Sequence, residues 1–297
     1  MGDIAIMAKK AEAYLESAGK LTEEKLKEYV PGETEIPAKL HSAMRYALLA
    51  GGKRLRPALV KASYEFFGGK PSDSIYMAMC SLEMLHTFSL IHDDLPCMDD
   101  DDFRRGKPTT HKVYGEATAV LAGDALCIYA FELIARTGNI TVVEELARAL
   151  GTKGMIGGQI IDTESEGKQV DLATVDYIHY HKTAALIESS LVIGALLANA
   201  KKEELRHIRE FGKGIGLVFQ IVDDILDIES STEELGKDAG SDVKNGKATY
   251  PAVLGLELSK QKAMEFYNKS LTYLEKLKDK DTETLQNIAA LIIARTH

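Results

Sequence analysis

The chain has 297 residues, of which 45% are hydrophobic and 27% charged, and its formal net charge is -9. This composition is typical of a globular protein with a sizeable core and excludes a disordered chain. The negative charge argues against nucleic acid as a partner, and a polyanionic substrate would need local bases or metal ions to overcome the field of the protein.

The cysteines and the apolar runs bear on location. Cys80, Cys97 and Cys127 form no CxxC pair, which favours a reducing compartment, so we expect a cytoplasmic protein. Residues 1–16 interleave acids and lysines with apolar residues, unlike a signal peptide. The apolar runs 120–135 and 185–200 contain acidic residues, so we expect no membrane span.

Hydrophobic periodicity predicts helices along almost the whole chain. Ile4 to Leu15 have apolar residues at spacings of three and four, which predicts an amphipathic helix that ends before Gly19. Caps, glycines and prolines delimit further helices over 37–50, 56–67, 72–93, 116–136, 141–161, 171–200, 202–228, 250–278 and 282–294.

The remaining segments predict neither strands nor a second domain. Residues 236–247, rich in Gly, Asp and Lys, form the longest stretch without periodicity and are expected to be a mobile flap. There is no alternating strand pattern, low-complexity linker or internal repeat. We therefore expect one all-α domain over residues 1–297, built as an antiparallel helical bundle.

The first chemical signal is HTFSLIHDDLPCMDDDDFRRG, residues 86–106. Six carboxylates fall between Asp93 and Asp102, and they repel one another more strongly if Asp93 closes a helix, whose C-terminal end is partly negative. Oxygen-only clusters suit Mg²⁺, which is usually shared with a substrate phosphate, and Arg104, Arg105 and Lys107 follow at once. The alternative, a solvated charged loop, applies best to Asp99–Asp102.

Two further stretches suggest ligand binding. In FQIVDDILDIE, residues 219–229, Asp223 and Asp227 share a helix face and interrupt an apolar run, where a solvated face is not expected. In GGKRLRP, residues 51–57, three basic residues beside a helix start suit an anion.

Together these stretches resemble a known family. DDLPCMD and DDILD resemble the two aspartate-rich motifs, DDxxxxD and DDxxD, of the trans-isoprenyl diphosphate synthases. From about residue 36 onward, GGKRLRP, LHTFSLIHDD, GQIIDTESEGK, HKTAAL and LGKDAGSDVKNGKATYP also match, in the order of the family. The pattern is most similar to that of bacterial farnesyl diphosphate synthases.

The resemblance implies a fold and a reaction. The fold would be an isoprenoid synthase bundle with a deep central pocket between the helices that end at Asp93 and Asp227. The reaction would be Mg²⁺-dependent condensation of isopentenyl diphosphate with dimethylallyl or geranyl diphosphate, with three metal ions and Mn²⁺ able to substitute. The expected product is farnesyl diphosphate, with geranylgeranyl diphosphate as the alternative, and the expected assembly is a homodimer.

The resemblance also assigns roles to residues. Isopentenyl diphosphate would bind Lys53, Arg56, His86 and Arg105, although a lone histidine in an apolar helix is more often a core residue. Thr183 and Gln220 would stabilise the carbocation, and with Lys182 and Arg104 they form the expected catalytic set. The metal ligands would be Asp93, Asp94, Asp99, Asp223, Asp224 and Asp227, and the allylic diphosphate would bind Arg104, Lys182, Lys237 and Lys247.

Product length is expected to depend on the helix before Asp93. Phe88 precedes Asp93 by five residues, about 7.5 Å along a helix, and Ser89 precedes it by four. A ring there would form the floor for the growing chain, whereas the alternatives are a plain core aromatic or a floor from a neighbouring helix.

Three rival functions are disfavoured. A catalytically silent partner subunit would tend to lose an acidic motif, and both are intact. A terpene cyclase would carry an Asn/Ser/Glu motif in place of DDILD. A cation-buffering acidic protein would not need the basic stretch GGKRLRP.

Overall fold

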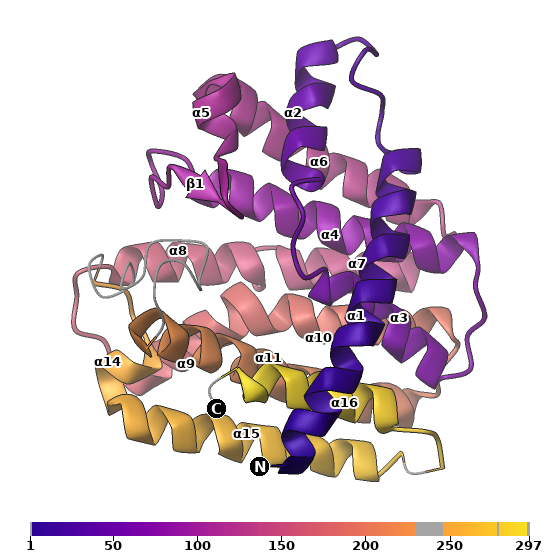
Figure 1. The fold of residues 1–297 in the computed structure, drawn as a ribbon, viewed down its shortest axis with the longest axis vertical. Helices are drawn as coiled ribbons and strands as arrows, with labels where there is room; N and C mark the ends of the chain where they lie inside the picture. Colours follow the sequence, from indigo (N-terminus) through magenta and orange to yellow (C-terminus); the bar gives the residue numbers. More distant parts are fainter. Residues whose placement is uncertain (1, 230–245, 278, 296–297) are drawn as a thin grey trace. The chain divides into compact units, whose positions relative to one another are not determined.

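The computed structural model describes residues 2–229, 246–277 and 279–295, and these are helical almost throughout (Figure 1). The all-α expectation is confirmed. Contacts divide the chain into two compact units: Met1–Tyr14, Leu59–Lys70 and Thr141–His297 form unit 1, and Leu15–Ala58 and Pro71–Ile140 form unit 2. The single domain over 1–297 stays a prediction.

Unit 2 is built around α4 (Asp73–Asp93) and α6 (Glu116–Ala135), which pack more extensively on each other than on any other described element. Figure 1 shows them side by side, with α2 (Ala38–Leu48) and α5 (Thr110–Tyr114) against α6. The close approach is possible because Gly123 has no side chain: a Cβ there would collide with the imidazole of His92. The packing holds the C-terminal end of α4 in place.

Unit 1 is built around α11 (Lys202–Glu229). This helix packs on α10 (Ala185–Leu197) and on α15 (Leu256–Glu275), and α16 (Glu283–Ala294) also contacts it. Glycines again permit close contact, because a Cβ on Gly216 would lie 2.6 Å from Cα of Ala184. The other elements of the unit are α7 (Ile140–Leu150), α8 (Met155–Ser165), α9 (Leu172–Ile178), the π-helix η1 (His179–Ala184) and α14 (Tyr250–Leu254).

Most predicted helices occur where the periodicity placed them, but the first is longer. α1 (Gly2–Tyr29) runs through Gly19, because buried side chains continue at helical spacing, including Ala18, Thr22 and Leu26. α3 (Leu55–Phe66) and α4 begin and end within one residue of the predicted bounds.

Three predicted elements differ from the structure. The helix expected over 141–161 is two helices, α7 and α8, because Gly151 and Gly154 form a turn between them. The helix over 171–200 contains the π-helical η1, and the one over 250–278 is divided at Gly255, where φ is +80°.

A strand pair, β1 (Phe103–Arg104) with β2 (Lys107–Pro108), was not predicted. The flap expected over 236–247 lies, up to residue 245, outside the described residues.

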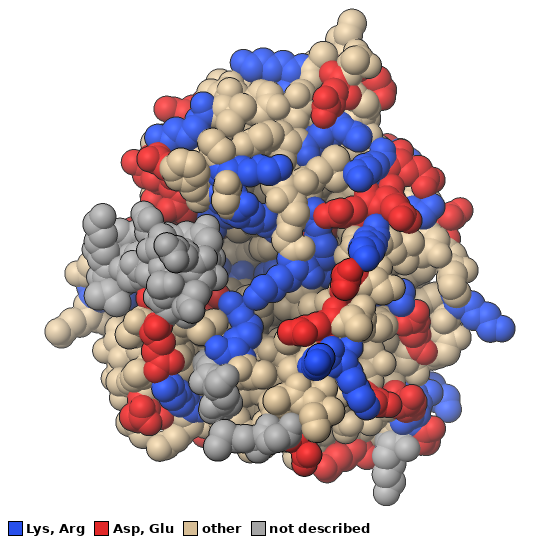
Figure 2. Space-filling model, in the orientation of Figure 1, with Lys and Arg blue, Asp and Glu red and all other residues tan. Residues whose placement is uncertain are grey.

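Two helices, α4 and α6, are long and apolar enough to cross a membrane by length and composition alone. Of the apolar window, 67% is buried in α4 and 39% in α6. Core helices of globular proteins pass the same test, so the absence of a membrane span remains a prediction. The surface in Figure 2 is not one apolar band: acidic and basic side chains are interspersed on the face shown.

Candidate functional site

The first acidic cluster forms a turn at the end of α4. The backbone N–H of Asp99 donates to the carbonyl of Asp93 at 2.8 Å, so the first and last residues of DDLPCMD are adjacent. Both side chains are half-buried. The hydrogen bond brings the two backbones together, and carboxylates such as those of Asp93 and Asp99 are the oxygen donors that a hard divalent cation prefers.

Asp94, between them in sequence, has a different environment. It is buried, and its Oδ1 accepts hydrogen bonds from Nε and Nη2 of Arg104 at 2.9 and 2.6 Å. Burial raises the pKa of Asp94 to about 6, although the guanidinium of Arg104 opposes this rise. Arg104 also pairs with Asp101 at 2.8 Å. In this structure Asp94 therefore orients Arg104, and its role as a metal ligand stays a prediction.

The strand pair places the two adjacent arginines. β1 and β2 are joined by a turn in which Arg105 has φ of +54° and Gly106 of +72°. Arg104 reaches Asp94, whereas Arg105 donates through Nη1 to the carbonyl of Gly51 at 2.6 Å. The turn thus directs one arginine to the acidic cluster and the other to GGKRLRP.

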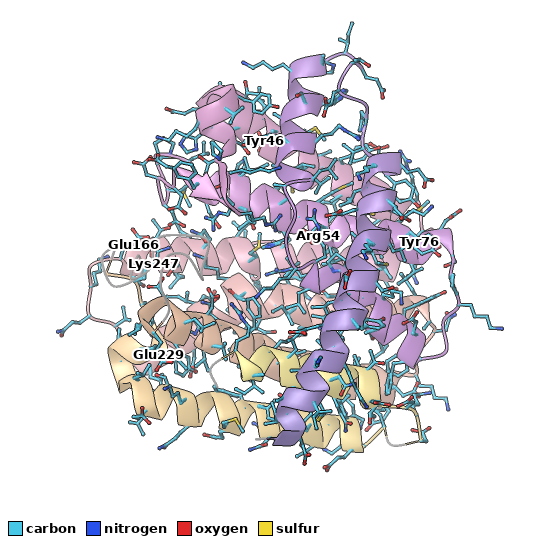
Figure 3. All side chains as sticks on the ribbon, viewed as in Figure 1. Tyr46, Arg54, Tyr76, Glu166, Glu229 and Lys247 are labelled. Carbon is cyan, nitrogen blue, oxygen red and sulfur yellow. The ribbon has the colours of Figure 1, made fainter. Side chains whose placement is uncertain are left out.

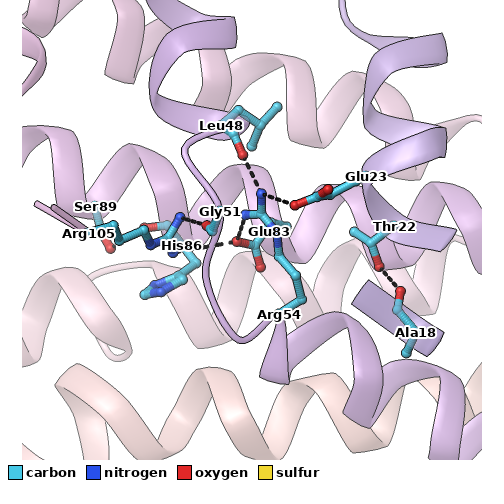
Figure 4. A network of polar contacts seen from close by, with 10 residues as sticks. All are labelled: Ala18, Thr22, Glu23, Leu48, Gly51, Arg54, Glu83, His86, Ser89 and Arg105. Atoms are coloured by element: carbon cyan, nitrogen blue, oxygen red, sulfur yellow. Dashed lines mark hydrogen bonds and ion pairs between the residues drawn. The ribbon is translucent and has the colours of Figure 1, made fainter. Parts of the chain in front are cut away.

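Within GGKRLRP, Arg54 is a residue that the sequence analysis did not single out. It is buried, and its Nη1 donates to Glu83 at 2.5 Å while its Nη2 donates to the carbonyl of Leu48 at 2.7 Å (Figure 4). Arg105 lies 3.7 Å from the same carboxylate. The sequence did contain a signal for this buried arginine: Glu83 is an acid within an apolar helix, and a buried carboxylate requires a cation as partner.

The expected isopentenyl diphosphate residues gather in unit 2. Burial lowers the pKa of Arg56 to about 10, and its buried Nε has no hydrogen-bond partner within the described part of the chain. Burial, followed by the charge of Arg56, holds the pKa of His86 well below its usual range, so the imidazole is neutral at pH 7. Lys53 is exposed. Arg54 and Arg105 both pair with the buried carboxylate of Glu83, and Arg54 also lies 3.4 Å from Glu23. A bound anion would add to the negative charge beside these guanidiniums.

The two expected product-length residues lie on α4. Phe88 is 9% exposed, and its ring contacts the ring of His92 edge to face at a centroid distance of 5.4 Å. His92 Nε2 lies 3.0 Å from the carbonyl of Val120 on α6. Ser89 is half-buried and donates to the carbonyl of His86. Phe88 thus packs on His92, which in turn contacts α6, but whether Phe88 stops chain growth stays a prediction.

The second acidic cluster occupies the last turns of α11. Asp223 is half-buried, with Nη2 of Arg295 at 3.7 Å, and Asp227 is buried. Asp224 is also buried and accepts from Nε2 of Gln220 at 2.9 Å and from the backbone N–H of Tyr250 at 3.0 Å. Asp224 is therefore engaged in hydrogen bonds inside unit 1.

Lys182 and Thr183 lie on η1, where π-helical geometry widens the turn, a feature frequent at functional sites. Lys182 Nζ donates to Asp162 of α8 at 2.6 Å, and Thr183 donates to Oε1 of Gln220 at 2.6 Å. The sequence motifs predicted roles for Lys182, Thr183 and Gln220 but not for Asp162, which lies within GQIIDTESEGK. The structure brings these three expected residues into one connected region.

Lys247 belongs to the same unit. The neighbouring Gly246 accepts a backbone hydrogen bond from Gly167 at 3.1 Å, so Lys247 lies beside the segment that follows α8, and Figure 3 labels it next to Glu166. Its side chain is half-buried. Lys237 lies outside the described residues.

The expected magnesium site can be compared with the side chains that could act as metal ligands. Over residues 2–229, 246–277 and 279–295, no group of three or more His, Cys, Asp or Glu side chains is arranged to hold a metal ion. Mg²⁺ is usually held by one or two carboxylates together with waters and substrate phosphates. Asp93, Asp99 and Asp223 fit that role, because their carboxylates are partly accessible.

The expected site residues are distributed over both units. Unit 2 contains the first acidic cluster, the arginines and Phe88, and unit 1 contains the second acidic cluster with Lys182, Thr183 and Gln220. The deep central pocket expected between α4 and α11 stays a prediction.

Comparison with known proteins shows the family. The polyprenyl synthetase family model matches residues 37–290. A geranylgeranyl pyrophosphate synthase of Capsicum annuum is 49% identical over 267 residues, which cover 87% of this chain and 72% of that protein. The farnesyl diphosphate synthase of Geobacillus stearothermophilus is 45% identical, over 96% of this chain and 98% of that protein.

A solved structure agrees with these relatives. The geranyltransferase of Helicobacter pylori, complexed with magnesium and isoprenyl diphosphate, has a TM-score of 0.84 and 34% identity, over 95% of this chain and 96% of that chain. The all-α fold is therefore that of the isoprenoid synthases. The chain belongs to the polyprenyl synthetase family and is a trans-prenyltransferase.

Proposed function

We propose that this enzyme condenses isopentenyl diphosphate head to tail with dimethylallyl and then geranyl diphosphate, releasing diphosphate and making farnesyl diphosphate. Geranylgeranyl diphosphate is the second candidate product, because the relatives include both kinds of synthase. The two acidic clusters and the two basic sets support the reaction.

Isopentenyl diphosphate would bind the basic residues of unit 2. Arg56 and Arg105 offer guanidiniums. Burial lowers the pKa of Arg56 to about 10, so it stays charged at pH 7, and burial also lowers the pKa of Arg105. Lys53 adds an exposed ammonium. A guanidinium fork suits the diphosphate oxygens. His86, neutral, would donate a hydrogen bond rather than a charge.

The allylic diphosphate would be held by Arg104, Lys182, Lys237 and Lys247. Two of these are oriented by carboxylates, Arg104 by Asp94 and Lys182 by Asp162. Positioned cations lower the barrier because they need no reorganisation when negative charge develops on the leaving group.

Magnesium fits the same reaction. Asp93, Asp99 and Asp223 would hold it, with three ions per active site and Mn²⁺ as a possible replacement, and the bound metal would neutralise the departing diphosphate. The H. pylori geranyltransferase complexed with magnesium and isoprenyl diphosphate supports this assignment.

One observation supports the fifteen-carbon product. Phe88 is a large ring one to two turns before Asp93, held against His92 of the same helix. A chain growing along α4 from the acidic cluster would meet this ring after few isoprene units.

The test is incubation of the pure protein with Mg²⁺, isopentenyl diphosphate and dimethylallyl diphosphate, followed by chromatography of the dephosphorylated products. We expect farnesol. Geranylgeraniol as the main product would contradict the product assignment but not the reaction class, and no condensation at all would contradict both.

We also propose that the enzyme is a homodimer that uses α6. This helix is strongly apolar, yet Leu121 and Ile128, two turns apart on one face, are 58% and 68% exposed. A second copy of the chain would cover this face.

We propose the cytoplasm as the location, since Cys80, Cys97 and Cys127 are free thiols.

A further inference from the structure

Asp224, the second carboxylate of DDILD, is surrounded by hydrogen-bond donors. Gln220 Nε2 lies 2.9 Å from its Oδ1, and the backbone N–H of Tyr250 and Nε2 of His179 lie 3.0 and 3.2 Å from its Oδ2. The Asp224 side chain is buried, and all these residues belong to unit 1.

His179 contributes a further donor. Its Nε2 faces the carboxylate of Asp224 at 3.2 Å, and the imidazole nitrogen that faces a carboxylate is the one that holds a proton. The other nitrogen, Nδ1, is buried with no hydrogen-bond partner within the described residues. The ring also stacks on Tyr250 at a centroid distance of 5.2 Å.

This environment fixes the direction of the Gln220 amide. A carboxylate only accepts hydrogen bonds, so Gln220 turns its NH₂ group toward Asp224 and its carbonyl oxygen away. That oxygen accepts the hydroxyl hydrogen of Thr183 at 2.6 Å. Thr183 has only one hydroxyl hydrogen, so its other face presents oxygen lone pairs.

We propose that Asp224 is a positioning residue: through Gln220 it holds the Thr183 hydroxyl so that oxygen lone pairs, and not the hydrogen, face the developing allylic cation. This inference rests on the proposed function, in which Thr183 lies near the allylic carbon. A hydroxyl free to rotate could turn its positive end toward the cation and oppose ionisation. Asp224 thus differs in role from Asp223, which would hold metal.

A double-mutant cycle tests the coupling. Asp224→Asn replaces an acceptor with an amide that can also donate, so Gln220 loses its fixed direction; Thr183→Val removes the hydroxyl at constant shape. Each should lower kcat by about tenfold, the scale of one hydrogen bond. Because both act through one hydroxyl, the double variant should also lose about tenfold. A loss of about a hundredfold, the additive result, would overturn the proposal.

Two comparisons separate this role from others. Thr183→Ser keeps a hydroxyl, so it should retain the full response to Asp224→Asn. Asp223→Asn should raise the Mg²⁺ concentration for half-maximal activity and weaken Mn²⁺ binding measured by electron paramagnetic resonance, whereas Asp224→Asn should change neither. An equal shift in both variants would show that Asp224 is a metal ligand and overturn the proposal.

The hydrogen bonds from Asp224 through Gln220 to Thr183 can also be tested without an activity assay. In ¹⁵N-labelled protein the side-chain amide of Gln220, assigned by its loss in Gln220→Leu, should exchange slowly with solvent and should exchange faster in Asp224→Asn. If the wild type fails to condense the substrates but shows this protection, the proposed function fails and the hydrogen-bond chain stands. If the wild type is active and the cycle is additive, only the positioning role fails.

Discussion

At the residue scale, Asp93 and Asp223 are the carboxylates whose removal tests the two acidic clusters most directly. Asp93→Ala and Asp223→Ala should each lower kcat at least about a hundredfold, since each removes a carboxylate that we propose as a ligand of the charge-stabilising metal. The measurement is steady-state turnover in metal-controlled buffer. Asp102→Ala is the matched control: Asp102 is exposed and pairs only on the surface with Lys112. Near wild-type turnover in either main variant contradicts the assignment.

The buried pair Arg54–Glu83 should matter for stability. Glu83→Ala leaves the buried guanidinium of Arg54 with the longer contact to Glu23, at 3.4 Å, in place of its buried carboxylate partner, so we expect a loss of about 3–5 kcal/mol in the free energy of unfolding. Urea denaturation measures it. The control is Glu283→Ala, which breaks the pair with Lys10, whose side chains are 58% and 59% exposed, and should cost about 1 kcal/mol or less. Equal losses would show that the buried pair contributes no more to the free energy of unfolding than the exposed pair.

At the element scale, α4 is expected to limit the chain length of the product. Phe88→Ala removes the ring and should shift the products toward longer chains, detected by chromatography after dephosphorylation. Leu82→Ala, buried in the same helix but about three turns before Asp93, is the control and should leave the product distribution as it is. An unchanged distribution from folded, active Phe88→Ala would place the floor on another element.

The contact between α8 and η1 depends on a glycine. A Cβ on Gly158 would collide with the backbone nitrogen of Lys182, so Gly158→Ala should push η1 away and separate Lys182 from Asp162. We expect both a lower Tm, from overpacking of about 1–3 kcal/mol, and a higher KM for the allylic diphosphate. Gln159→Ala, next to it and half-buried, should change neither by comparable amounts. A variant with normal KM would show that the contact only stabilises.

The same elements show what sequence can and cannot predict. The ends of α4 and α11 were predicted because long apolar periodicity ends there in acidic residues. The division between α7 and α8 was missed, since glycines within a helical pattern, such as Gly151 and Gly154, are compatible with either outcome. The π-helical turn η1 was missed because no residue pattern distinguishes it from an α-helix.

Within the candidate site, the sequence did not predict the contacts between residues that are distant along the chain. The Asp motifs, Lys182, Thr183 and Gln220 were expected from local motifs. The partners that orient them were not: Asp162 for Lys182 and Tyr250 for Asp224 come from segments distant in sequence. Arg54 was passed over for the same reason, because only the fold shows that it, and not Lys53, is buried with Glu83.

At the scale of the whole molecule, the net charge of -9 is offset locally. Basic residues that we propose to hold the two diphosphates, including Arg105, Arg104 and Lys182, pair with the buried carboxylates of Glu83, Asp94 and Asp162. In the proposed reaction, fixed cations and metal would act over a few ångströms, whereas the global field is screened over about 8–10 Å by salt.

The homodimer is the last prediction and concerns the same scale. Wild-type protein at micromolar concentration should sediment at about twice the chain mass of 32.5 kDa. Ile128→Glu places a charge on the exposed apolar face of α6 and should shift the protein to monomer, because an uncompensated charge is costly to bury in an interface. Ile140→Glu is the matched control: Ile128 and Ile140 are both 68% exposed, but Ile140 begins α7 and lies off that face. Monomeric wild type, or equal dissociation by both substitutions, would rule out α6 as the contact.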